Sequence, residues 1–136
     1  MSGQVNRTTP TSINRGGRTM DTRQLIETYH HAWTNGDFVT ARTCLADKLD
    51  FQGSINTFSK AEDFIAVLTQ FKQLLKGVTL LNSFFDHQSA ALLYDCDSAS
   101  PAGIIRTAEF FTVSDNKISA IRLVFDATEL RKLMPA

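Results

Sequence analysis

The chain has 136 residues, its 14 lysines and arginines balance 14 aspartates and glutamates, and 43% of its residues are hydrophobic. This length fits one domain with enough apolar residues to form a core without metal or disulfide support. The balanced charge excludes the basic field typical of nucleic-acid and membrane-surface proteins, and no apolar stretch approaches the roughly 20 residues that cross a bilayer. We therefore expect a soluble protein without nucleic-acid or membrane partners.

The first 20 residues differ in composition from the rest. They carry three arginines, no acidic residue and only two aliphatic residues. So little apolar surface predicts a disordered tail over 1–20 and one folded domain over 21–136. The Arg-Gly-Gly-Arg run at 15–18 resembles RNA-binding repeats, but a single copy makes that only a minor alternative. Helical periodicity starts directly after Met20, so this methionine is an alternative start of the chain.

Apolar residues spaced three and four apart predict the first helix, from Leu25 to Trp33. The Asn-Gly-Asp turn at 35–37 ends this helix, because its glycine suits the left-handed backbone that commonly follows a helix. Asp37 is a typical N-cap and predicts a second, short helix through Cys44.

A third helix is predicted after a short strand over residues 49–52. Residues 59–62, Ser-Lys-Ala-Glu, have the pattern of a capping box, in which the first and fourth residues cap each other's backbone. Apolar residues from Phe64 to Leu75 line one face of the helix, which we expect to end at Gly77.

Beyond residue 77 the hydrophobic period changes to two, which predicts strands. Short connections separate successive strands, so we expect an antiparallel meander. The predicted strands occupy residues 78–86, 90–97, 103–114 and 118–126. A last short helix is expected at about 127–133.

The last two of these strands carry apolar residues on both faces. In 103–114, Glu109 and Phe111 share one face, while Ala108 and Phe110 share the other. An antiparallel sheet with one face in water alternates between apolar and polar residues, so both faces here require a cover. The helices cover one face, and we expect a second copy of the chain, in a homodimer formed through the sheet, to cover the other.

The order of these elements, with the turn at 35–37 and the closing segment 117–126, resembles the nuclear transport factor 2-like superfamily, and most of all its SnoaL-like polyketide cyclase branch. The likeness spans about residues 21–133. It implies an α+β, cystatin-like fold in which a curved antiparallel sheet wraps around N-terminal helices into a cone with a pocket inside. Members of this superfamily include isomerases, cyclases, epoxide hydrolases, dehydratases and non-catalytic binding or scaffold proteins, so the resemblance does not fix a function.

Similarity to ketosteroid isomerase, a member of this superfamily, nominates site residues. Its oxyanion-hole tyrosine corresponds to Tyr29 and its buried acid to Glu109. Its general-base aspartate corresponds to Gly53, so the base is missing and steroid-type proton transfer is disfavoured. Asp126 ends the last strand and is either a further catalytic acid or base, as in SnoaL-like cyclases, or the N-cap of the final helix.

Glu109 has two interpretations, because a carboxylate inside the cone is costly unless it is paired, hydrogen-bonded or protonated. In the first it is a structural residue that bonds Tyr29 or Trp33, or reaches the rim and forms a salt bridge. In the second its pKa is raised, so that near neutral pH it donates a hydrogen bond to a ligand beside Tyr29.

No metal or cofactor is expected. His30 and His31 lie on different sides of their helix and cannot chelate one metal ion. Phosphate-binding and metalloprotease motifs are absent. Cys44 and Cys96 lack metal-type spacing, which indicates reduced core thiols in a cytoplasmic protein.

We expect a SnoaL-like protein whose apolar pocket binds a small hydrophobic molecule, with walls from Trp33, Leu92, Tyr94, Phe111, Leu123 and Phe125. Two alternatives remain open. One is an isomerase, cyclase or lyase that performs acid–base chemistry on an apolar carbonyl compound, polycyclic or otherwise, through Tyr29 and Glu109. The other is a non-catalytic interaction module whose cone is filled by its own side chains.

Overall fold

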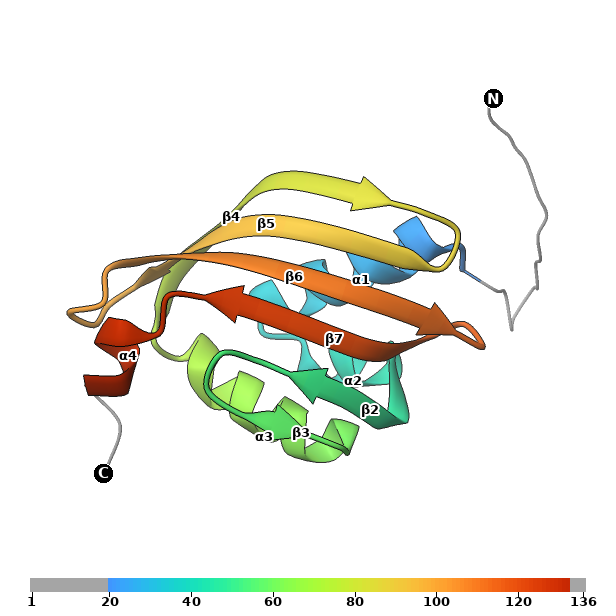
Figure 1. The fold of residues 1–136 in the computed structure, drawn as a ribbon, viewed down its shortest axis with the longest axis horizontal. Coiled ribbons are helices and arrows are strands. Elements are labelled where there is room, and N and C mark those ends of the chain that lie inside the picture. Colours follow the sequence, from blue (N-terminus) through green and yellow to red (C-terminus); the bar gives the residue numbers. More distant parts are fainter. Residues whose placement is uncertain (1–19, 133–136) are drawn as a thin grey trace.

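A curved sheet lies over three helices (Figure 1). The computed structural model describes residues 20–132, so the predicted tail, apart from Met20, lies outside it. The elements in chain order are α1 (Thr22–Thr34), α2 (Phe38–Thr43), β2 (Leu45–Gln52), β3 (Thr57–Phe58), α3 (Ala61–Lys72), β4 (Leu75–Phe85), β5 (Ser89–Ser98), β6 (Ile104–Ser114), β7 (Lys117–Phe125) and α4 (Thr128–Lys132). None of the helices within this range is long and apolar enough to span a bilayer.

The six strands follow the order β3-β2-β7-β6-β5-β4. Strands β4 to β7 form the predicted antiparallel meander, because each follows its neighbour through a short connection. Strand β2 joins the other side of β7 in parallel, with Leu45 opposite Ile118 and Phe51 opposite Ile121. The α+β fold with a curved, mostly antiparallel sheet is therefore confirmed.

A capping box starts α1 rather than α3. The Asp21 carboxylate accepts a hydrogen bond from the Gln24 backbone N–H at 2.8 Å, and the Gln24 side chain accepts one from the Asp21 N–H at 3.1 Å. The capping box predicted at 59–62 is wrong, because α3 begins one residue later, with Lys60 as an N-cap that makes no side-chain capping bond. The Glu62 carboxylate pairs with Arg42 instead.

Strand pairing also moves two predicted boundaries. Helix α3 ends at Lys72 and not at Gly77, because Leu75 and Gly77 already pair with β5. Strand β2 begins four residues before the predicted start, since Leu45 pairs with β7. The short strand β3 was not predicted. The N-cap at Asp37 is confirmed, because its carboxylate accepts a hydrogen bond from the Thr40 N–H.

Burial along β6 alternates residue by residue, as the strand pattern predicts. Ile105, Thr107, Glu109, Phe111 and Val113 are buried. Successive strand side chains point to opposite faces, so these five lie on the face of the sheet that the helices cover. The apolar members join residues of α1, α3 and β2 in one core.

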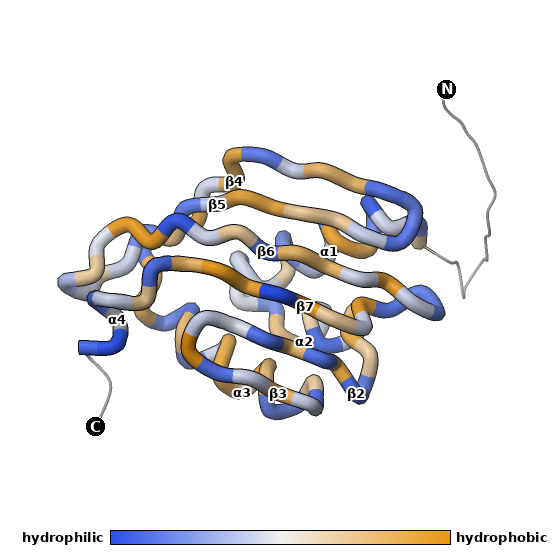
Figure 2. Tube along the Cα trace, viewed as in Figure 1, coloured by the Kyte–Doolittle hydropathy of each residue, from blue (hydrophilic) through white to orange (hydrophobic). Residues whose placement is uncertain are grey.

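The opposite, outer face of the sheet is apolar as well. Phe84, Phe110 and Val124 are 66%, 49% and 56% exposed. Hydrophobic residues recur along β4, β6 and β7 in Figure 2. The prediction that the last two strands are apolar on both faces is confirmed, and the identity of the cover on the outer face stays a prediction. The predicted free thiols are also found, since Cys44 and Cys96 are buried and unpaired.

Replacement of Gly36 by alanine is expected to lower the free energy of unfolding by about 1 kcal/mol. Gly36 has a φ of +81°, and a Cβ there would meet no atom within 4 Å, so the cost is purely one of backbone conformation. The matched control is Gly77→Ala, which also has open space but lacks a positive φ. Urea unfolding of both variants checks this, and an equal loss in both would contradict the explanation.

Candidate functional site

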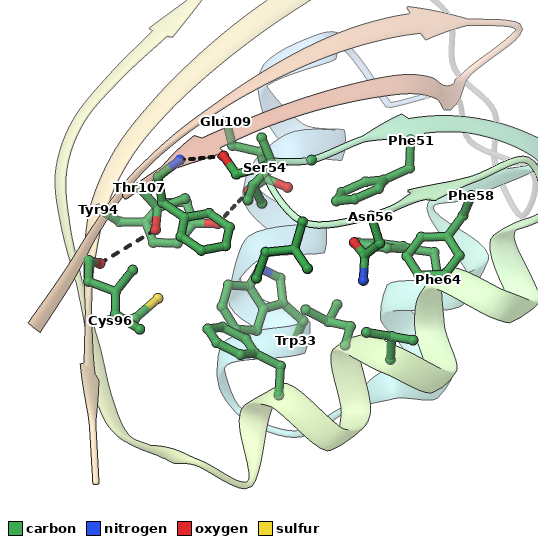
Figure 3. Close-up of a pocket in the computed structure, with 18 of the residues that line it drawn as sticks. Trp33, Phe51, Ser54, Asn56, Phe58, Phe64, Tyr94, Cys96, Thr107 and Glu109 are labelled. Atoms are coloured by element: carbon green, nitrogen blue, oxygen red, sulfur yellow. Dashed lines mark hydrogen bonds between the residues drawn. The ribbon is translucent and has the colours of Figure 1, made fainter. Parts of the chain in front are cut away.

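A pocket of about 130 Å³ lies between the helix-covered face of the sheet, α1, α3 and the loop 53–56 (Figure 3). Its apolar walls include Phe51, Phe58, Phe64, Leu68, Phe71, Ile105, Leu123 and Phe125. Its polar groups are few and include Tyr29, Trp33, Tyr94 and Glu109. A mostly apolar cavity with a few polar groups is the usual form of a small-molecule site.

Glu109 is the most unusual group in this pocket. It occupies the middle of β6, opposite Leu92 on β5 and Leu123 on β7, and is only 1% exposed. Its Oε1 accepts a hydrogen bond from the Tyr94 hydroxyl at 2.8 Å (Figure 3). No basic side chain in the described part of the chain forms an ion pair with it. The structural interpretations from sequence named Tyr29, Trp33 or a rim salt bridge as partners; the observed partner is Tyr94.

Burial raises the pKa of Glu109 to about 7, against an ordinary value of 4.5, although the bond from Tyr94 opposes the shift. Desolvation has this effect because a charged carboxylate loses more favourable hydration than a neutral carboxyl group does. Near pH 7 both protonation states of Glu109 are therefore populated. This is the range in which a carboxyl group serves as an acid or a base in catalysis.

Two further buried groups of the pocket are hydrogen-bond donors without an acceptor. The Tyr29 hydroxyl and the Trp33 Nε1 have no partner among residues 20–132, and both side chains are almost completely buried. Burial and the nearby charge of Glu109 raise the pKa of Tyr29 well above its ordinary value, so its hydroxyl keeps its proton. Most buried polar groups in proteins are paired, so both donors are open to an acceptor from a water molecule or a ligand in the pocket.

Two neighbouring titratable groups stay neutral. The His30 ring lies 5.0 Å from the Tyr94 ring and 5.7 Å from the Trp33 ring, and burial lowers its pKa to about 4. Burial raises the pKa of the Cys96 thiol, in the pocket wall, to about 12, so it is a poor nucleophile. Within the described residues no three histidine, cysteine or acidic side chains gather in an arrangement that holds a metal ion.

The predicted site residues fall into three groups. The pocket brings together Tyr29, Trp33, Tyr94, Glu109, Leu123 and Phe125. Leu92 and Phe111 are buried but belong to the adjoining core, where the Phe111 ring meets the Tyr29 ring edge-on at 5.9 Å.

Asp126 lies outside the pocket and is exposed. Its Oδ1 accepts hydrogen bonds from the Thr128 N–H at 3.0 Å and the Thr128 hydroxyl at 2.7 Å, and these bonds lower its pKa. Thr128 is the first residue of α4, so the N-cap position falls at Ala127 and the predicted N-cap at Asp126 is one residue early; the carboxylate instead holds a turn that leads into the helix.

The loop 53–56 forms part of the pocket wall and was not predicted as such. The Ser54 hydroxyl accepts a hydrogen bond from the Phe125 N–H at 3.0 Å, which fastens the loop to the end of β7. A Cβ at Gly53 would lie 2.9 Å from the Phe51 ring, so a carboxylate at that position would displace Phe51. The loop has no hydrophobic period, and its role depends on contacts with segments about 70 residues away in sequence.

The fold has close counterparts among solved structures. A protein from Kribbella flavida DSM 17836, whose crystal structure is described only as that of a "known function protein", is 31% identical to this chain, with a TM-score of 0.75. The match covers 80% of this chain and 89% of the Kribbella chain. No family model matches the sequence, and no curated protein does.

Two more distant structures show the same fold. An NTF2-like protein of unknown function from Cytophaga hutchinsonii ATCC 33406 is 18% identical over 82% of this chain and 96% of its own, with a TM-score of 0.72. A proposed polyketide cyclase from Sinorhizobium meliloti is 14% identical over 74% of this chain and 93% of its own, with a TM-score of 0.67. At these identities the likeness shows the nuclear transport factor 2-like fold alone.

The raised pKa of Glu109 predicts a specific pH dependence of stability. A carboxyl group with a folded pKa of about 7 and an ordinary value of 4.5 binds more protons in the folded chain, so its contribution is fully present below pH 4.5 and is lost as pH rises through 7. Relative to Glu109→Gln, the wild-type protein should lose about 3 kcal/mol of unfolding free energy between pH 4 and 8.

Urea unfolding of the two proteins across this pH range makes the measurement. His30 has the opposite effect, because its folded pKa of about 4 lies below the ordinary 6.5 and adds stability as pH rises. Its contribution is common to both proteins and cancels in the difference. Parallel stability curves for wild type and Glu109→Gln would contradict the assigned shift.

Proposed function

We propose that this chain binds a small, predominantly apolar molecule in its pocket. The chain belongs to the same protein family as the Kribbella flavida protein and has the nuclear transport factor 2-like fold. The observation that carries the proposal is the pocket itself: about 130 Å³ of space with aromatic and aliphatic walls inside the core. Burial of an apolar ligand there removes its surface from water, which supplies the binding free energy.

The volume of the pocket limits the size of the ligand. An apolar cavity of about 150 Å³ holds benzene, whereas pockets for drug-sized molecules measure about 300–1,000 Å³. A cavity of about 130 Å³ therefore suits a molecule of about one ring. This favours a one-ring compound over the polycyclic substrates considered from sequence, and it disfavours the pure interaction module, in which side chains fill the cone.

Acid–base catalysis is the second candidate function, and Glu109 favours it. This carboxyl group has a pKa of about 7 and lies in a pocket that also holds Tyr29 and Tyr94. Such a group can accept a proton from a ligand or return one at neutral pH. The likeness to the proposed polyketide cyclase is in keeping with this candidate and with a place in the SnoaL-like branch.

Ligand binding is tested by closing the pocket at its rim. Val67 lines the pocket and is 38% exposed, so Val67→Trp adds bulk there without disturbing the core. We expect this variant to abolish the rise in melting temperature that one-ring ligands such as toluene cause in the wild type. Val39→Trp is the matched control, because Val39 is 80% exposed and outside the pocket. If no one-ring compound raises the melting temperature of the wild type, the proposal fails.

We also propose that the outer face of the sheet forms a homodimer. Two neighbouring rows of the sheet register make a continuous apolar surface there: Phe84, Ala91 and Phe110 in one row, and Leu93, Ala108 and Val124 in the next. The exposed ion pairs Arg122–Asp50 and Arg106–Asp95 flank these rows. Apolar patches with a polar rim are typical of protein interfaces, and a self-complementary patch of this kind suits a two-fold axis.

A charge in the centre of this patch should separate the dimer. Phe110→Glu is expected to convert the protein from dimer to monomer, because the new carboxylate would be buried against an apolar surface. Val39→Glu introduces the same charge at an exposed apolar residue outside the patch and should leave the dimer intact. Sedimentation velocity at tens of micromolar distinguishes the species, and a wild-type protein that is monomeric would refute the proposal.

A further inference from the structure

The pocket contains two donors that the chain does not satisfy. The Trp33 indole N–H and the Tyr29 O–H are buried, line the same pocket and have no acceptor among the described residues. An indole N–H can only donate, and a tyrosine hydroxyl near neutral pH keeps its proton. A buried donor without an acceptor costs free energy, so a ligand that brings an acceptor gains more than its apolar surface alone provides.

We infer that the ligand is a neutral one-ring molecule with a single acceptor oxygen, such as a ketone, aldehyde or ester, and that Trp33 and Tyr29 donate to this oxygen. The inference rests on the proposed function, because it names the class of molecule that the same pocket binds. It adds a requirement that the apolar walls do not impose: the ligand must carry a hydrogen-bond acceptor.

The pocket has two chemically different ends, which would orient the ligand. The Tyr94 hydroxyl binds Glu109, and the Tyr94 ring lies 6.0 Å from the Trp33 ring, so Tyr94, Glu109 and Trp33 share one end of the pocket, whereas Asn56 lies at the other end. In Figure 3 the indole nitrogen of Trp33 faces the side of the pocket where Glu109 lies. Phe51, Phe58 and Phe64 come together at the other end, where the ligand's ring belongs.

The charge of the pocket excludes anions. Its lining contains no lysine, arginine or histidine, and its one ionisable acid is Glu109. A carboxylate ligand would lose its hydration without gaining a cation and would lie near a second carboxyl group. An ammonium ligand could pair with Glu109, but it would place additional donors beside the two donors that lack an acceptor. A neutral acceptor satisfies Trp33 and Tyr29 with neither penalty.

Four one-ring probes of similar size separate these cases: acetophenone, its hydrocarbon isostere α-methylstyrene, benzoate and 1-phenylethylamine. Their affinities are measured at pH 7 by NMR titration of the wild type and of Tyr29→Phe. We expect Tyr29→Phe to weaken acetophenone about tenfold, the size of one lost hydrogen bond, and to change α-methylstyrene less than about twofold. Its melting temperature should be unchanged or higher, because the deleted hydroxyl has no partner in the chain.

A second readout needs no substitution. Trp33 is the only tryptophan, so its indole N–H gives a single, unambiguous signal in a ¹⁵N–¹H spectrum. Acetophenone should move this proton further downfield than α-methylstyrene does, because the two probes have the same shape and similar ring currents but differ in the acceptor. Equal shifts, together with an equal effect of Tyr29→Phe on both probes, would overturn the inference and leave the proposed function standing.

The remaining outcomes are also decisive. Tighter binding of benzoate or of 1-phenylethylamine than of acetophenone would overturn the neutral-acceptor assignment. If none of the four probes binds, the proposed function itself fails, and this result is distinct from a failure of the acceptor assignment. Weak binding of benzoate and the amine, with an acceptor-specific response for acetophenone, is the expected result.

Discussion

The chemistry of the pocket depends on one constraint, the burial of the Glu109 carboxyl group at the centre of the sheet with one hydrogen-bond partner among the described residues. Leu92 and Leu123 flank it on the neighbouring strands, and among residues 20–132 only the Tyr94 hydroxyl bonds it. An isolated charge there would be costly, so the site favours the protonated form up to nearly neutral pH. Carboxyl groups with strongly shifted pKa values are concentrated at functional sites, which is in keeping with the proposed ligand site.

The two faces of the sheet serve separate purposes in this account. On the inner face, α1, α3 and the loop 53–56 leave a small cavity lined by aromatic side chains. On the outer face, Phe110 and Val124 remain exposed and are available to a second copy. Successive side chains of β6 and β7 point to opposite faces of the sheet. The same two strands therefore contribute to the pocket on one face and to the proposed dimer interface on the other.

Sequence periodicity was sufficient to place Glu109 inside the fold, because a two-residue period assigns each strand residue to a face and the resemblance identified which face is inner. It could not identify Tyr94 as the partner, since that contact depends on the register between β5 and β6. The capping box was misplaced because α3 begins one residue later than the Ser-Lys-Ala-Glu pattern indicates. The position of the loop 53–56 could not be predicted, because it depends on the hydrogen bond from the Phe125 N–H to the Ser54 hydroxyl, and these residues lie far apart in the sequence.

The ionisation of Glu109 in the free protein can be followed through the ¹³C chemical shift of its side-chain carboxyl group during an NMR titration. We predict a midpoint near pH 7, well above the ordinary value of 4.5. A midpoint at or below 4.5 would mean that the carboxylate is ionised and stabilised inside the pocket. That result would contradict a Glu109 carboxyl group that stays protonated up to nearly neutral pH because it is buried with few partners.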